Sequence, residues 1–165
     1  MKGNAPDWNG TLEQRFNRKI SRDEETGCWI WTGSKTWDGY GRIQRSRENI
    51  YAHRVSWELA NGPIPQGMML DHYVCGNVSC VNPDHLRLAT PQQNCHNCSL
   101  PKHNTSGFKG VYWDKEAGKW KAQITFNKKK INLGRFEAID EARLAYCEAA
   151  KKYHGNFANF GSRNE

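Results

Sequence analysis

Apolar positions in the first half of the chain predict short helices and strands rather than one long element. Residues spaced four apart after a threonine indicate a helix over 11–20, and a second helical spacing, closed by Asn-Gly-Pro, indicates a helix over 51–60. The aromatic and β-branched run 28–33 is typical of a buried strand. An Asp-Gly pair at 38–39, followed by alternating residues, predicts a hairpin whose return strand carries three arginines. These are Arg42, Arg45 and Arg47.

Residues 68–97 predict the order strand, strand, helix. The apolar run 68–70 leads into Asp71 and His72 as a first short strand, and 86–89 (LRLA) forms a second. Thr at the N-cap, Pro at the first position and Gln at the third position then open a helix. Asn94 falls in the first or second turn of this helix, so the chain can aim it back at the end of the first strand.

The last third of the chain has a different pattern. Residues 99–106 (SLPKHNTS) lack periodicity and are typical of a linker. Three alternating runs at 107–113, 119–124 and 130–136 are separated by turn signals and predict antiparallel strands. A stripe of small residues in 138–154 predicts a helix that lies close on this sheet.

These elements define an α+β fold class with two domains. Residues 1–98 form the first domain, 99–106 the linker, and 107–165 a small three-stranded antiparallel sheet plus a helix. The mean hydropathy of −0.89 argues against one large core. Small domains bury too little surface to be comfortably stable alone, so a metal staple would help the first one.

The net charge of +7 and the pI near 9.2 favour a polyanionic partner, either nucleic acid or an anionic membrane surface. No apolar run approaches the roughly 18 residues that span a bilayer, and the start MKGNAPDWNG does not resemble a signal peptide. We therefore expect no membrane insertion and a reducing cytoplasmic location. Clustered cysteines in that compartment are more often metal ligands than disulfides.

Two metal chemistries are interleaved within residues 70–97. One group offers thiolates and an imidazole, which suit a closed tetrahedral zinc site. The other offers oxygen ligands and a titratable base, which suit Mg²⁺-assisted hydrolysis. The first group is Cys75, Cys80 and His85, and the second is Asp71, His72 and Asn94.

This segment resembles the HNH, or ββα-metal, nucleases, most closely their His-Cys-box homing endonuclease branch and related phage enzymes. The matching pieces are Asp71-His72, CVNPDHL at 80–86 and TPQQN at 90–94. The resemblance implies that His72 is the general base that takes a proton from the attacking water. It also implies that Asp71 and Asn94 are ligands of a catalytic Mg²⁺ or Mn²⁺ ion.

The resemblance further implies a structural zinc held by Cys75, Cys80, His85 and a fourth ligand from an upstream strand. Cys28 is the only upstream cysteine, which gives a Cys₃His site. In simpler HNH proteins the position of His85 is an Asn that orients the base. If His85 binds zinc, a backbone carbonyl must orient His72 instead.

Two simpler interpretations stand beside these assignments. A purely structural zinc knuckle would give no reason for an Asp-His pair and Asn94 to stand beside it. Cys95 and Cys98 form a CxxC on the expected helix, and we interpret them as free thiols, with a second zinc as the alternative.

Most of 107–160 resembles the AP2 DNA-binding domain. The matching pieces are GFKGV at 107–111, KW at 119–120, LGRF at 133–136, EA at 141–142 and NFANF at 156–160. The resemblance implies a sheet laid in the major groove of double-stranded DNA that carries sequence selectivity. The charge agrees, because residues 104–165 hold 12 Lys and Arg against 7 Asp and Glu, whereas the first 103 hold 12 against 10.

Both domains supply candidate DNA contacts. The three arginines of the first could line a phosphate track or form a solvated basic edge strand. In the second, the exposed sheet face would present long basic side chains to phosphates and Gln123 to a base edge. Trp120 is assigned to the core because its strand neighbours take the opposite face. The sheet candidates are Lys109, Trp113, Lys119, Lys121, Gln123 and Lys130.

The sequence therefore predicts a site-selective DNA endonuclease of the homing or phage HNH type. It would hydrolyse phosphodiester bonds with one divalent cation and a His base, inside a bacterium or phage-infected host. The alternative is a non-catalytic, zinc-stabilised DNA-binding regulator, which does not need Asp71, His72 and Asn94. A homodimer would favour cutting of both strands.

Overall fold

A computed structural model describes residues 10–96, 100 and 104–160. The chain divides into two compact units, Met1–Pro91 and Gln92–Glu165, which are described separately. Among the described residues, none of the helices has the length and apolar character needed to cross a membrane. The α+β fold class predicted from the sequence is confirmed.

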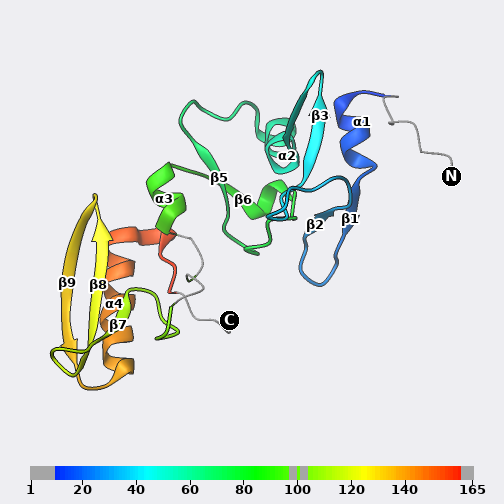
Figure 1. The fold of residues 1–165 in the computed structure, drawn as a ribbon. Coiled ribbons are helices and arrows are strands. Elements are labelled where there is room, and N and C mark those ends of the chain that lie inside the picture. The colour runs from blue at the N-terminus through cyan, green and yellow to red at the C-terminus, as the bar shows by residue number, and fades with distance from the viewer. Residues whose placement is uncertain (1–9, 97–99, 101–103, 161–165) are drawn as a thin grey trace. The chain divides into compact units, whose positions relative to one another are not determined.

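Six described strands of the first unit pair as three small antiparallel sheets, β1–β2, β3–β4 and β5–β6 (Figure 1). A 3₁₀ turn at Pro83–His85 precedes β6. The elements are α1 (Leu12–Asn17), β1 (Ile20–Arg22), β2 (Trp29–Trp31), β3 (Arg42–Arg45), β4 (Glu48–Tyr51), α2 (Ala52–Asn61), β5 (Met69–His72) and β6 (Leu86–Ala89).

The first helix begins where the sequence predicted. The Thr11 hydroxyl accepts a hydrogen bond from the Gln14 amide at 3.2 Å, and the Gln14 side chain accepts one from the Thr11 amide at 3.0 Å. The helix ends at Asn17 rather than at residue 20, because Ile20 pairs with Trp31 in the β1–β2 sheet. Strand β1 was not predicted.

The predicted turn at Asp38-Gly39 is present, since Lys35 and Gly41 form an antiparallel bridge across it and the Arg42 amide donates to the Ser34 carbonyl at 2.8 Å. The strand that follows, Arg42–Arg45, pairs along its length with Glu48–Tyr51 and so forms a second hairpin that was not predicted. The turn between them contains Ser46, with a positive φ of 54°. Arg42 and Arg45 are three positions apart on one strand and therefore point to opposite faces of the hairpin.

The core of the first unit is built around two stacked rings. Phe16 and Trp31 have ring centroids 5.5 Å apart, and Ile43, Val55 and Val81 are buried beside them. These residues come from α1, β2, β3, α2 and the segment before the 3₁₀ turn, so one small cluster joins most of the unit.

The second unit contains the predicted three-stranded antiparallel sheet, in the order β7–β8–β9, and a long helix. Strand β7 starts later than predicted, because Gly110 before it has a positive φ of 68°. A Cβ at Gly110 would lie 2.3 Å from the Tyr146 ring, so only glycine fits. The elements are α3 (Pro91–His96), β7 (Val111–Asp114), β8 (Lys119–Phe126), β9 (Lys129–Phe136) and α4 (Ile139–His154).

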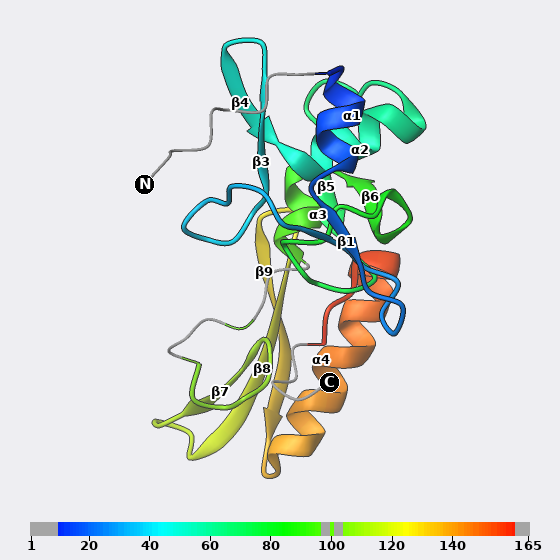
Figure 2. The same cartoon turned by 90° about the vertical axis from the view of Figure 1, so that its right-hand side faces the viewer.

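Helix α4 covers one face of this sheet, and no other described helix of the same unit covers the opposite face (Figures 1 and 2). Val111, Ala122 and Ile124 are buried against small residues of α4, with Tyr146 between them. Because side chains alternate along a strand, the residues between these buried positions point to the open face.

Candidate active site and metal centre

Backbone pairing brings the distant cysteines of the first unit together. The Val81 amide donates to the carbonyl of Trp29 at 2.7 Å, and the Trp31 amide donates to the carbonyl of Ser79 at 2.9 Å. The segment between Ser79 and Val81 therefore runs beside β2. Cys28, immediately before β2, reaches Cys80 in this way.

Cys28, Cys75, Cys80 and His85 form a cluster whose ligand atoms all lie within 4.8 Å of one another. The His85 Nδ1 atom is 3.6 Å from the Sγ atoms of both Cys28 and Cys80. A tetrahedral zinc ion keeps its sulfur and nitrogen ligands roughly 3.5 to 3.8 Å apart. The four residues could therefore hold a structural metal such as zinc, and they are the four that the sequence nominated.

Burial makes these thiols poor acids without a cation. It raises the pKa of Cys80 to about 12 and also raises the pKa of Cys75. A metal ion would compensate the thiolate charges and displace the protons. The Asn82 amide lies 3.4 Å from the Cys80 sulfur and donates to it, as expected for a ligand that carries negative charge.

The candidate base His72 is buried at the end of β5 and contacts the backbone of the metal cluster. Its Nε2 atom lies 3.0 Å from the carbonyl oxygen of Cys80. A carbonyl oxygen can only accept, so Nε2 carries the proton and Nδ1 is the basic nitrogen. This is the kind of contact that the sequence required if His85 belongs to the metal cluster. The role of His72 as a base stays a prediction.

A second imidazole, which the sequence did not nominate, packs against His72. The ring centroids of His53 and His72 are 5.0 Å apart, and the Tyr40 ring contacts both. Burial, with the nearby charges of His72 and Arg54, lowers the pKa of His53 to about 3. His53 is therefore neutral at physiological pH. Its position as the second residue of α2 gave no sequence signal of this contact.

Asp71 is buried beside His72 and pairs with an arginine across the sheet. Its Oδ2 atom accepts from Arg87 Nε at 2.9 Å and lies 2.8 Å from the terminal nitrogen of the same side chain. Asp71 and Arg87 are register partners of β5 and β6, and the guanidinium lies over the Tyr73 ring. The sequence missed Arg87 because only the strand register shows that it faces Asp71.

Asn94 lies on α3, which belongs to the second unit. Its proposed position beside Asp71 therefore stays a prediction. Cys95 is exposed on the same helix. Cys98 lies outside the described residues, so the choice between free thiols and a second zinc is not tested.

The arginines of the β3–β4 hairpin differ in their surroundings. Arg45 is bound to Glu58 through both terminal nitrogens, at 2.8 and 2.6 Å, which offsets its charge. Arg42 and Arg47 are exposed. Their roles in DNA binding stay predictions.

The sheet candidates of the second unit do not all share one face. Lys119, Lys121, Gln123 and Lys130 alternate with buried positions and take the open face. Trp113 lies on the opposite face from the one predicted, because it is the register partner of Trp120 and their rings meet edge to face at 5.2 Å. Lys109 precedes β7, on neither face of the sheet.

Comparison with known proteins gives two family matches. Residues 50–96 match the model of HNH endonucleases, and residues 106–156 match the AP2 domain. Protein 3.8 of Escherichia phage T7 is 40% identical over 108 residues, which cover 66% of this chain and 88% of the relative. The chain belongs to the HNH endonuclease family, with an AP2 domain after the HNH domain.

Other relatives share shorter segments with this HNH protein. Protein 7.7 of the same phage is 39% identical over 67 residues, covering 41% of this chain and 51% of the relative. Protein 2.8 is 34% identical over 86 residues, covering 51% of this chain and 58% of the relative. The HNH match includes the Asp71-His72 pair and Asn94, whereas Cys28 lies before it.

Proposed function

We propose that this HNH protein is a DNA endonuclease that hydrolyses phosphodiester bonds at sites selected with its AP2 domain. The observation that supports the proposal most is the buried Asp71-His72 pair, in which a backbone carbonyl fixes one nitrogen of His72. A DNA-binding regulator needs zinc and a recognition surface, but it does not need an oriented base beside a buried carboxylate.

In this proposal, His72 acts through Nδ1. Because Nε2 donates to the Cys80 carbonyl, Nδ1 of the neutral imidazole carries no proton. Nδ1 accepts a proton from water as the water oxygen attacks phosphorus. The phosphorus–oxygen bond to the leaving group then breaks, and solvent protonates the leaving oxygen. Packing against His53 restricts rotation of the His72 ring, which favours a productive orientation.

Asp71 and Asn94 would hold the catalytic cation, since carboxylate and amide oxygens are ligands that Mg²⁺ and Mn²⁺ accept. When bound, the cation would stabilise the negative charge that develops on the phosphate and the leaving oxygen. Arg87 offsets the charge of the buried Asp71 carboxylate and holds its Oδ2 atom in place. Cys28, Cys75, Cys80 and His85 would hold zinc, which would fix the Cys80 carbonyl that orients His72.

The remaining assignments extend the same proposal. Residues 1–98 would cut, 99–106 would connect, and 107–165 would bind double-stranded DNA through the sheet. The exposed arginines 42 and 47 would add phosphate contacts. The similarity to phage proteins supports action inside an infected bacterial cell. A homing-type role would be part of the same proposal. A homodimer would allow both strands to be cut.

Supercoiled plasmid tests the activity directly. We expect the zinc-loaded protein to convert it to nicked or linear DNA when Mg²⁺ or Mn²⁺ is added, because the cation completes the charge stabilisation. Without added cation, gel shifts should still show binding. Selective binding with no cleavage under any divalent cation would favour the regulator.

The pH dependence of cleavage should reflect the surroundings of His72. Burial lowers the pKa of His72 below its usual 6.5, although the Cys80 carbonyl and the Asp71 charge oppose this shift. A base must be neutral to accept a proton, so the rate is expected to stay high at pH 6.5 and to fall only at lower pH. Single-turnover rates between pH 5 and pH 8 at saturating Mg²⁺ measure this. A rate that already falls above pH 7 would contradict the assignment.

A further inference from the structure

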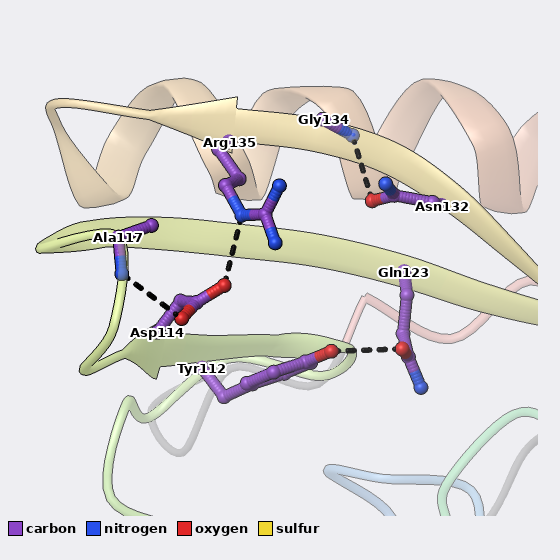
Figure 3. Close-up of polar contacts among 7 residues, drawn as sticks. All are labelled: Tyr112, Asp114, Ala117, Gln123, Asn132, Gly134 and Arg135. Atoms are coloured by element: carbon purple, nitrogen blue, oxygen red, sulfur yellow. Dashed lines mark hydrogen bonds and ion pairs between the residues drawn. The ribbon is translucent and has the colours of Figure 1, made fainter.

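The open face of the AP2 sheet carries polar side chains that hydrogen-bond to one another, and of these only Gln123 is among the candidate DNA contacts above. Two pairs stand out in Figure 3, on the side of the sheet away from α4. One joins β9 to β7 through Arg135 and Asp114, and the other joins β7 to β8 through Tyr112 and Gln123.

The Arg135 side chain is held through its Nε atom, while its terminal nitrogens are not part of that hydrogen bond. Its Nε donates to Asp114 Oδ2 at 2.8 Å, and in the part of the chain that the structure describes this is the contact that holds its side chain. The Arg135 side chain is 49% exposed, whereas that of Asp114 is 14% exposed. The guanidinium is therefore the more exposed partner, and the hydrogen bond to Asp114 uses Nε rather than the terminal nitrogens. Asp114 is itself fixed, because it also accepts from the Ala117 amide at 3.3 Å.

The second pair shows that the neighbouring part of the face is also ordered. The Tyr112 hydroxyl donates to Gln123 Oε1 at 2.8 Å, so the amide nitrogen of Gln123 is the group left to contact a ligand. Lys121 Nζ lies 5.7 Å from the centre of the Tyr112 ring. The outward groups of this patch are therefore hydrogen-bond donors.

The net charge of a side-chain group indicates whether it is better suited to contact a base or a phosphate. Arg135 and Asp114 together are close to neutral, so the pair adds little long-range attraction for a phosphate. An arginine held at Nε keeps two parallel N–H groups in a fixed plane, which match the two acceptors O6 and N7 of guanine. Basic side chains of the face for which the described residues show no ion pair, such as Lys121 and Lys130, are better suited to phosphates.

We propose that Arg135, positioned by Asp114, reads a guanine in the major groove and is a main determinant of site choice. This inference rests on the proposed function, because it takes double-stranded DNA as the ligand of the sheet.

The test uses the full-length protein without added Mg²⁺, so that DNA stays intact. Duplexes bound from a random library are sequenced, and a guanine is expected at a fixed position. Replacing that base by 7-deazaguanine removes the N7 acceptor and keeps the pairing. Affinity should fall about 5- to 150-fold, the usual discrimination of a bidentate base contact.

Arg135→Met keeps an unbranched side chain of similar reach and removes every N–H donor, whereas lysine could still donate to O6 or N7 of guanine. This variant should bind all DNA more weakly, should bind normal and 7-deaza duplexes equally and should no longer select the guanine. The matched control is Arg143→Met on α4, whose guanidinium lies over the Phe108 ring on the other side of the sheet. It should select the same sequence as the wild type. Thermal melting checks that both variants are folded.

The variant Asp114→Asn tests whether Asp114 positions Arg135 or only changes the net charge of the sheet. Removal of a negative charge should keep or raise affinity for unrelated DNA, while the preference for guanine falls because Arg135 is no longer fixed. A uniform rise in affinity with unchanged preference would overturn the positioning role of Asp114.

The outcomes also separate this inference from the proposed function. If the wild type selects a sequence and Arg135→Met selects the same one, the guanine contact is wrong and AP2-directed site choice stands. If the wild type binds DNA with no preference at all, both are wrong.

Discussion

Replacement of His72 by alanine is expected to lower the rate of DNA cleavage by about 10²- to 10⁴-fold, the usual contribution of a general base, with DNA affinity close to that of the wild type. The side chain is buried and its Nε2 atom is bound to a backbone carbonyl, so the reacting nitrogen is Nδ1. Single-turnover cleavage and gel shifts on the same DNA measure the two quantities separately.

The matched control is His154→Ala in the AP2 domain. The Nε2 atom of His154 also contacts a backbone carbonyl, that of Thr125 at 3.1 Å, but the residue is far along the sequence from the proposed chemistry. It should leave the cleavage rate within a few-fold of the wild type. A His72→Ala protein that loses binding and cleavage equally, or keeps full cleavage, would reject the base.

The metal cluster could be predicted from the sequence because ligand chemistry does not depend on knowing the fold. Thiolates and an imidazole at short spacing indicate zinc wherever the strands lie. Cys28 was added because the resemblance to HNH nucleases implies an upstream ligand, and it is the only cysteine there. The four side chains do meet in the structure. The backbone atoms around the cluster could not be predicted from the sequence, because the pairing of residues 79–81 with β2 is a long-range contact.

Contacts that depend on strand register were missed. Arg87 faces Asp71 and Arg135 reaches Asp114 only because of how the strands align, and alternation alone cannot supply that alignment. The hairpin prediction was half right for a related reason. The Asp-Gly pair does make a turn, bridged by Lys35 and Gly41, but the longer pairing of the strand after it is with Glu48–Tyr51 across a turn at Ser46 and Arg47 that carries no strong turn signal.

Trp113 shows how a one-position error reverses a face. The sequence placed it on the open side of the sheet, whereas Tyr112 takes that side and Trp113 meets Trp120. The run Val111-Tyr112-Trp113 is apolar throughout, so it contains no polar residue that marks the solvent side. Burial of Val111 against α4 decides the register, and this contact is visible only in the folded sheet.

Cys28→Ser is expected to unfold the HNH domain and to abolish cleavage. Structural zinc contributes roughly 10 to 16 kcal/mol in small zinc domains, as much as the whole stability of a typical domain. Serine offers no thiolate, and the core around Phe16 and Trp31 is small. The wild type should contain about one zinc per chain by metal analysis. The variant should lose zinc and its cooperative thermal transition for this domain, while the AP2 domain keeps its own.

Cys147→Ser on α4 is the matched control, because it makes the same change outside the cluster. It should retain zinc and cleavage. Loss of zinc should remove activity even where some structure persists, since the Cys80 carbonyl that binds His72 belongs to a ligand of the cluster. A folded, zinc-free protein that still cuts DNA would rule out the zinc assignment, and two zinc ions per chain would return Cys95 and Cys98 as ligands of a second site.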